Sequence, residues 1–191
     1  MDFQSLIEPL AALLRASHLQ GFKIPANEER LIANLFVDDT TTFLSEFDNF
    51  EDLQKILKNW CNASTAKFNI QKTEIIPIGT PEFRAKVFNT QRMTEASEEI
   101  PSHIHIVKDG EPVRILGAWV GNKIDNENIW STQLNKIDQA LKRWEKSNPT
   151  IEGRKLITQM TVGGMTQYLT QVQGMPAAVE KKLERRAKIF I

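Results

Sequence analysis

Asp38 and Asp39 form the pair of side chains whose type and spacing best suit chemistry in this sequence. The pair lies between two runs of apolar and β-branched residues, 35–37 and 40–44. Val, Thr and Phe favour strands, whereas Asp is common in turns. The pattern predicts a β-hairpin with strands over 31–37 and 40–44 and both aspartates at its tip.

A tight tip would project both carboxylates in nearly one direction. Mg2+ and related hard cations take oxygen ligands, and they favour carboxylates that leave room for substrate phosphates. Asp38 and Asp39 are therefore candidate ligands for Mg2+ or Mn2+. The alternative is a solvated turn whose carboxylates only cap the backbone.

Two later segments follow the aspartate pair in a fixed order: Lys67-Phe68-Asn69-Ile70-Gln71-Lys72-Thr73-Glu74, and then Ile115-Leu116-Gly117-Ala118-Trp119-Val120-Gly121-Asn122. Together these blocks resemble the later palm motifs of reverse transcriptases, and more narrowly those of non-LTR (LINE-type) retrotransposons. Phe-Val-Asp-Asp is similar to the family's aromatic-x-Asp-Asp signature. The resemblance covers nearly the whole chain.

The resemblance implies an α+β fold in two parts. Residues 1–122 would form a partial palm, a small antiparallel sheet with packed helices that carries the Asp-Asp hairpin. Residues 123–191 would form a helical thumb-like segment. The implied enzyme is an RNA-directed DNA polymerase, a nucleotidyltransferase, with an RNA template and a DNA primer as partners.

In this family, two cations about 3.5–4 Å apart activate the attacking oxygen and stabilise the leaving one. By resemblance, Asp38 and Asp39 are catalytic and hold these cations. A third carboxylate would come from an earlier strand, which the sequence does not show. We therefore expect the chain alone to bind a cation weakly and to have little or no polymerase activity, unless a separate N-terminal polymerase half completes the site.

The resemblance assigns two further residues. Lys72 matches the lysine of the family's Asn-x-x-Lys segment and would stabilise charge or donate a proton at the leaving pyrophosphate. Gly117, in a Leu116-Gly117 turn, matches the primer-grip region, where glycine lets the backbone approach a ligand strand. A solvated lysine at a strand start is the alternative for Lys72.

The elements that would position these residues follow from hydrophobic periodicity. An apolar stripe predicts a helix over 2–17, with Pro9 inside it; its members are Phe3, Leu6, Ile7, Leu10, Leu13 and Leu14. Asp48 is the expected N-cap of a second helix with Glu51 at the capping-box position. The packed face of that helix is expected to carry Leu53, Ile56, Leu57, Trp60, Cys61 and Ser64. A short strand is expected near 75–78.

Residues 80–101 suggest a surface excursion with partial helix. The alternating residues 103–107 predict a strand, and the Asp109-Gly110 turn signal predicts that it pairs as a hairpin with 113–120.

The last third of the sequence predicts helices. A stripe from Trp130 to Trp144 forms the first, and a second from about Glu152 should bend or break at Gly163-Gly164. A final helix after Pro176 is basic and carries the candidate nucleic-acid-binding residues Lys181, Lys182, Arg185 and Arg186. Phosphate backbones need such positive charge, although an ordinary amphipathic helix would look the same.

Composition narrows the function classes. Net charge is zero overall, but residues 1–60 carry five basic and ten acidic side chains and residues 136–191 carry eleven and five. The single Cys61 excludes an internal disulfide and suits a reducing compartment. No signal or membrane segment is predicted. We expect a soluble intracellular protein, nuclear or cytoplasmic by resemblance.

Two other functions compete with the polymerase. A receiver domain needs a helix directly after its Asp pair, and here strand residues follow, which excludes it. A non-catalytic module that binds nucleic acid through the basic C-terminal helices remains open. A truncated palm would also expose an apolar patch or strand edge, so aggregation or a need for a partner chain is expected.

Overall fold

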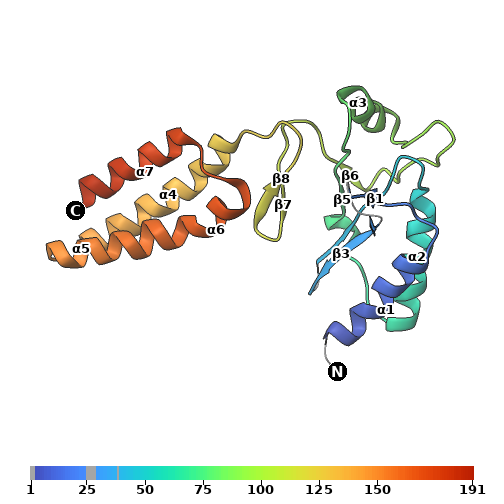
Figure 1. Cartoon of the computed structure of the whole chain (residues 1–191), viewed down its shortest axis with the longest axis horizontal. Coiled ribbons are helices and arrows are strands. Elements are labelled where there is room, and N and C mark those ends of the chain that lie inside the picture. Colours follow the sequence, from blue (N-terminus) through green and yellow to red (C-terminus); the bar gives the residue numbers. More distant parts are fainter. Residues whose placement is uncertain (1–2, 25–28, 38) are drawn as a thin grey trace. The chain divides into compact units, whose positions relative to one another are not determined.

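The computed structural model describes residues 3–24, 29–37 and 39–191, and it divides into two compact units, 1–108 and 109–191 (Figure 1). Helices and small, mainly antiparallel sheets occur in it, which confirms the α+β class. The division after Lys108 differs from the expected division at 122/123. The reason is that the hairpin over 113–120 contacts a helix of the C-terminal unit.

The N-terminal unit contains three helices, one 3-10 turn and three two-stranded sheets among its described residues. In chain order its elements are α1 (Phe3–Ala16), β1 (Phe22–Lys23), β2 (Arg30–Leu31), β3 (Ala33–Phe36), β4 (Asp39–Thr42), α2 (Phe50–Ser64), η1 (Ile70–Lys72), β5 (Glu74–Ile75), α3 (Pro81–Thr90) and β6 (His105–Ile106). The pairs β1–β2 and β3–β4 are antiparallel, and β5–β6 is parallel. Each described strand therefore keeps one edge without a strand neighbour.

Helices α1 and α2 pack together against the β3–β4 hairpin strands and confirm the two predicted apolar stripes. Their shared core consists of Leu10, Leu14, Leu19, Ile32 and Leu53, with Trp60 and Phe68 packed at its edge. The α1 stripe is narrower than expected because Leu13 is 45% exposed. The N-cap of α2 is Asn49, whose side chain accepts the Glu51 N–H, and the prediction of Asp48 was wrong by one residue.

Asp48 instead forms a buried clasp between two chain segments. It is 5% exposed. Its carboxylate accepts the backbone N–H groups of Gln20 at 2.6 Å, Gly21 at 2.9 Å and Ser45 at 2.8 Å. These bonds join the segment after α1 to the segment after β4. A charged acceptor strengthens each bond, and three donors satisfy the carboxylate without a counter-ion.

The second core of the N-terminal unit lies between α3 and the β5–β6 pair. It contains Val87, Ile100, Ile104 and Ile106. The expected hairpin between 103–107 and 113–120 was wrong, because β6 pairs in parallel with β5, through Glu74↔His105 and Ile75↔Ile106. The turn signal Asp109-Gly110 stands at the boundary between the two units rather than inside a hairpin.

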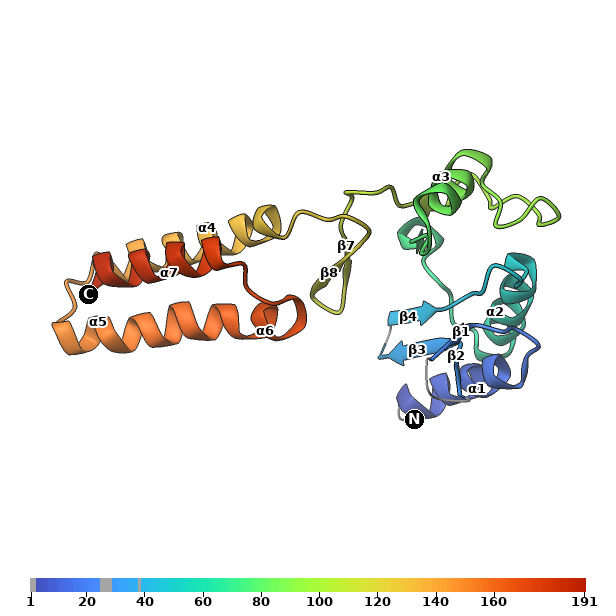
Figure 2. The same ribbon diagram turned by 45° about the horizontal axis from the view of Figure 1, so that its top comes forward.

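The C-terminal unit is a hairpin and a helical bundle (Figure 2). Its elements are β7 (Val113–Ile115), β8 (Ala118–Val120), α4 (Asn126–Glu145), α5 (Ile151–Thr158), the π-helical turn η2 (Gln159–Gly163), α6 (Gly164–Gln173) and α7 (Ala177–Phe190). Asp125 caps α4 and Thr150 caps α5. The predicted interruption at Gly163-Gly164 is the π turn, through which α5 continues into α6.

The bundle core confirms the predicted α4 stripe except at Trp144, which is 43% exposed. Trp130, Leu134, Ile137 and Leu141 of α4 are buried against residues of the other helices: Ile157, Leu169, Val179, Leu183 and Phe190. Since α4 contributes the largest share, it is the central helix of this unit.

Replacing Asp48 with Ala should destabilise the N-terminal unit. It leaves three backbone donors without their acceptor, so we expect a loss of about 2–4 kcal/mol in the free energy of unfolding. Urea unfolding followed by the indole NMR signal of Trp60, the one tryptophan of residues 1–108, measures it. Glu46→Ala removes a nearby exposed carboxylate and should change stability by less than about 0.5 kcal/mol. Equal losses in the two variants would contradict the clasp.

Candidate functional site

The aspartate hairpin is shorter and differently registered than expected. β3 and β4 pair through Ala33↔Thr42, Asn34↔Thr41, Leu35↔Thr40 and Phe36↔Asp39. Asp39 therefore begins β4 opposite Phe36, instead of sharing the tip as predicted. Asp38 lies outside the described residues. The strands themselves were correctly predicted within a few residues.

Val37 adopts a left-handed backbone conformation in this turn, with φ of +52°. A β-branched residue rarely adopts this conformation, and its cost is about 1–3 kcal/mol. Phe36 and Val37 are 59% and 56% exposed, and Asp39 is exposed as well. The hairpin end thus presents apolar side chains and a carboxylate together to solvent.

Asp39 supplies one hard oxygen donor group, which is the chemistry that Mg2+ or Mn2+ requires. Within residues 3–24, 29–37 and 39–191, no group of three His, Cys, Asp or Glu side chains gathers that could hold a metal ion. The donor type fits a divalent cation, whereas the number of described donors does not complete a site. A cation bound here would need Asp38 and at least one carboxylate from elsewhere.

Lys72 ends the 3-10 turn η1 and is exposed. The turn closes through the Lys72 N–H, which donates to the Asn69 carbonyl at 3.0 Å. Among the described residues, no hydrogen bond or ion pair joins the ammonium group to Asp39. The structure therefore does not assemble Lys72 and the hairpin carboxylate into one charged cluster.

Gly117 occupies the turn between β7 and β8, where Leu116 and Gly117 have φ of +48° and +86°. A Cβ on Gly117 would lie 3.1 Å from the Tyr168 ring. The Tyr168 hydroxyl donates to the Leu116 carbonyl. The close approach expected of this glycine is therefore made to the chain's own tyrosine, so the ring occupies the side on which a ligand strand was expected.

Gln173 fastens the same hairpin to α6. Its amide oxygen accepts the Trp119 N–H at 3.0 Å, and its amide nitrogen donates to the Trp119 carbonyl at 3.2 Å. The side chain thus satisfies both backbone groups of one β8 residue, as a neighbouring strand would. Together with Tyr168, it places the 115–122 block on the helical bundle.

Of the four predicted nucleic-acid-binding residues on α7, three are exposed. Lys181, Lys182 and Arg185 have no ion-pair partner among the described residues, whereas Arg186 is engaged. Its guanidinium donates to both carboxylate oxygens of Asp138 on α4, at 2.6 and 2.9 Å. The hydrogen bonds from Arg186 to Asp138 raise the pKa of Arg186 above its ordinary value. Arg186 therefore fixes α7 on α4.

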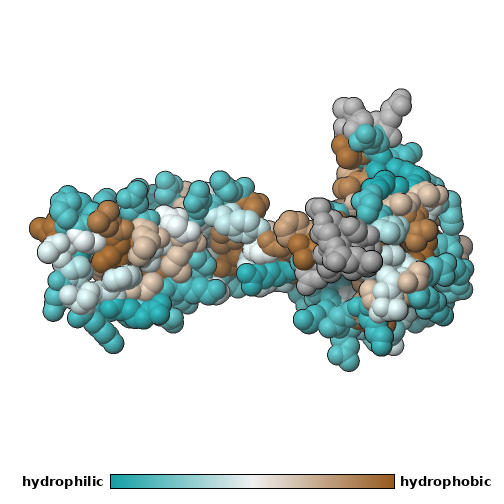
Figure 3. All heavy atoms as spheres, turned by 90° about the horizontal axis from the view of Figure 1, so that it is seen from below, coloured by the Kyte–Doolittle hydropathy of each residue, from teal (hydrophilic) through white to brown (hydrophobic). Residues whose placement is uncertain are grey.

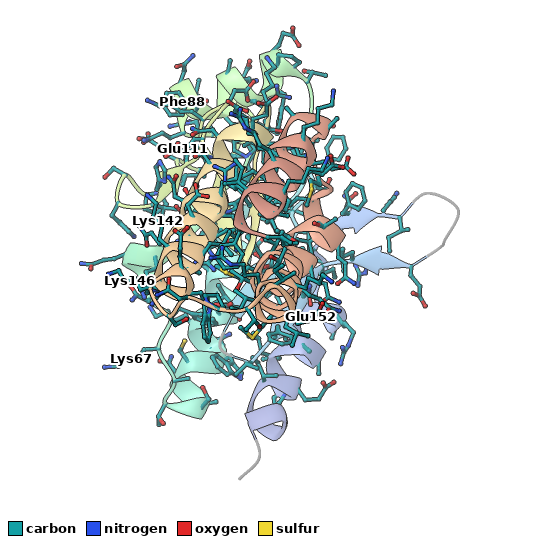
Figure 4. All side chains as sticks on the ribbon, turned by 90° about the vertical axis from the view of Figure 1, so that its left-hand side faces the viewer. Lys67, Phe88, Glu111, Lys142, Lys146 and Glu152 are labelled. Atoms are coloured by element: carbon teal, nitrogen blue, oxygen red, sulfur yellow. The ribbon has the colours of Figure 1, made fainter. Side chains whose placement is uncertain are left out.

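Two further exposed lysines of the C-terminal unit were not singled out from the sequence. Lys142 and Lys146 extend outward from the C-terminal end of α4 (Figure 4), and both are exposed. They could have been recognised from the α4 pattern, since the predicted apolar stripe leaves positions 142 and 146 on the solvated side.

Comparison with protein-family models gave no match, and a search of curated proteins gave none. No described helix is both long enough and apolar enough to span a membrane. The geometry and the sequence motifs are therefore the evidence for function.

Replacing Gly117 with Ala should cost more stability than the same change at Gly110. Both glycines have positive φ, of +86° and +88°, but only Gly117 has a neighbour within 4 Å of an added Cβ. For Gly110→Ala, backbone strain alone predicts a loss of about 1 kcal/mol in the free energy of unfolding. For Gly117→Ala, the added clash with Tyr168 predicts a larger loss, of roughly 2–3 kcal/mol.

Urea unfolding followed by the indole NMR signals of Trp119 and Trp130 measures both losses. In a Tyr168→Ala background the two substitutions should cost the same, because the clash is gone. An unchanged difference in that background would show that Tyr168 is not the cause.

Proposed function

We propose that this chain is the C-terminal part of a reverse-transcriptase domain of the non-LTR type, whose family activity is RNA-templated DNA synthesis. The observation that carries the proposal is the position of Asp39. It begins β4 opposite Phe36, its side chain is exposed, and Asp38 precedes it in the Phe-Val-Asp-Asp sequence. An exposed carboxylate at this end of the hairpin supports the proposal.

In the proposed mechanism, Asp38 and Asp39 would hold divalent cations with a third carboxylate from outside the described residues. The cations, when bound, supply activation of the attacking oxygen and stabilisation of the leaving one. The exposed Asp39 carboxylate contributes an oxygen ligand. The exposed Lys72 would reach the leaving pyrophosphate only when substrate and the rest of the domain are present.

The proposal predicts weak Mn2+ binding that depends on the aspartate pair. Titration with Mn2+, followed by paramagnetic broadening of amide signals in residues 33–42, should show a site in the wild type. Asp39→Asn should weaken binding by at least about tenfold, because an amide lacks the ligand charge. Glu46→Gln is the matched control, since it also neutralises one exposed carboxylate nearby.

Primer extension on an RNA template with Mg2+ completes the test. We expect no extension by the isolated chain and extension in the presence of a polypeptide that supplies the missing strand, lost again with Asp39→Asn. Mn2+ broadening that is equal in Asp39→Asn and the wild type would overturn the cation site.

A second function, a module that binds nucleic acid without catalysis, is favoured by the exposed cations of the C-terminal unit. Lys181, Lys182 and Arg185 are exposed on one helix, and Lys142 and Lys146 are exposed on its neighbour α4. Phosphate contacts of this kind need no base recognition, so binding would be independent of sequence.

This function predicts a strong dependence of affinity on salt. The measurement is fluorescence anisotropy with an RNA–DNA duplex over a range of salt concentrations. In the variant Lys181→Ala/Lys182→Ala/Arg185→Ala, the slope of log K against log salt should decrease in magnitude by about 2–3, because each lost phosphate contact removes about 0.9. Lys23→Ala/Lys58→Ala/Lys67→Ala removes three exposed cations from the N-terminal unit and should leave the slope unchanged. Absence of binding at low salt would exclude this function.

A further inference from the structure

One side of the continuous α5–η2–α6 helix carries an apolar stripe that the other described elements of the C-terminal unit leave exposed, apart from the contact of Tyr168 with the β7–β8 turn. Leu156, Met160, Tyr168 and Val172 are 68%, 58%, 49% and 45% exposed. Gly164, also exposed, lies at the middle of the series. We call these five positions the 156–172 stripe. Figure 3 looks onto this side of the unit, where pale and brown surface runs between teal margins.

The stripe stays on the outer side of the helix along its whole length. The residue after each of its members faces inward: Ile157, Thr161, Met165, Leu169 and Gln173 are buried or half-buried. A spacing of four residues drifts by roughly 40° per step around an α-helix. The π turn η2 inserts one residue, which offsets about 100° of the roughly 160° that four such steps accumulate. The stripe therefore turns by only about 60° over its length, which suits a second helix that crosses or winds slightly around the first.

The stripe lies in a part of the chain without charge. No residue from 156 to 179 is charged, whereas residues 109–191 as a whole carry thirteen basic and nine acidic side chains. The exposed positions beside the stripe include glutamines, at 159, 167 and 171. Depletion of charge and enrichment in Met and Tyr are typical of the centre of a protein interface. Exposed apolar patches of this kind mark interaction sites.

The two central glycines are not required by the fold of the chain itself. Gly163 and Gly164 both have φ of −62°, which any residue adopts. A Cβ added to either would meet nothing within 4 Å. Glycine destabilises a helix interior relative to alanine. Glycines on an open helix face allow a second backbone to approach closely.

We propose that a second copy of this chain docks on the 156–172 stripe in antiparallel orientation, with a two-fold axis at Gly164. The stripe is symmetric about this residue, with apolar side chains four and eight positions away on each side. In an antiparallel pair, Leu156 faces Val172 of the second copy, and Met160 faces Tyr168. The same patch then serves both subunits, as an isologous interface requires.

Charge also favours this occupant. A neutral face meets its own copy without like-charge repulsion, whereas two copies of the basic α7 surface would repel. Antiparallel packing places the N-terminal end of each helix beside the C-terminal end of the other, where the helix partial charges are of opposite sign. Tyr168, whose hydroxyl is bound to Leu116, enters the interface with its ring already positioned.

Sedimentation velocity of the full chain over a range of concentrations tests the proposal. We expect a reversible monomer–dimer equilibrium. Leu156→Lys and Val172→Glu, each alone, should raise the dissociation constant at least about tenfold, since each buries an unpaired charge. Asn135→Lys adds a charge at an exposed position of α4, outside the stripe and its flanking glutamines, and should leave the dissociation constant unchanged. Circular dichroism checks that each variant keeps its helix content.

The double variant Leu156→Lys/Val172→Glu fixes the orientation. In an antiparallel pair, the new ammonium group at position 156 would face the new carboxylate at position 172 of the second copy, so association should recover relative to either single variant. A parallel pair would place like charges together and stay weak, which would overturn the two-fold arrangement. A wild type that remains monomeric at every concentration, or a dimer insensitive to both single substitutions, would overturn the proposal itself.

Discussion

The N-terminal unit depends on one buried charge, the carboxylate of Asp48. A carboxylate can be buried when hydrogen bonds replace its water, and here three backbone N–H groups from two separate segments do so. The bonds tie the chain that leaves α1 to the chain that leaves the β3–β4 hairpin. Since both strands of that hairpin lie between these two ties, Asp48 limits how far the hairpin can move from the α1–α2 core.

The C-terminal unit relies on a different kind of tie, in which side chains of α6 take the place of a neighbouring strand. Gln173 satisfies both backbone groups of Trp119, and Tyr168 reaches Leu116 at the turn. A two-stranded hairpin is marginal by itself in water. Its attachment to the bundle explains why residues 109–122 belong with the C-terminal helices, although their sequence motif suggested the N-terminal part.

Prediction from the sequence was most accurate where a repeating apolar pattern was compatible with one structure, as in α1, α2 and α4. It was wrong where a short polar motif was compatible with two different structures. Asp48 and Asn49 are both good N-caps, and only tertiary donors decided between them. The Phe-Val-Asp-Asp motif located the hairpin, but the strand register put Asp39 in β4. Arg186 looked like its basic neighbours because its partner Asp138 stands forty-eight residues earlier. Spacing identifies which residues carry charge, and packing decides which charges remain free for a ligand.

The parallel β5–β6 pair has a kinetic consequence. Two parallel strands cannot be joined by a tight turn, so their ladder closes only after the whole intervening segment, including α3, has been brought back. Closing a loop of this length lowers the entropy of the chain before any hydrogen bond of the ladder has formed. Within the N-terminal unit, the β1–β2 and β3–β4 pairs join residues that are close in the sequence, whereas the β5–β6 pair does not. We therefore expect the β5–β6 ladder to close late in the folding of this unit.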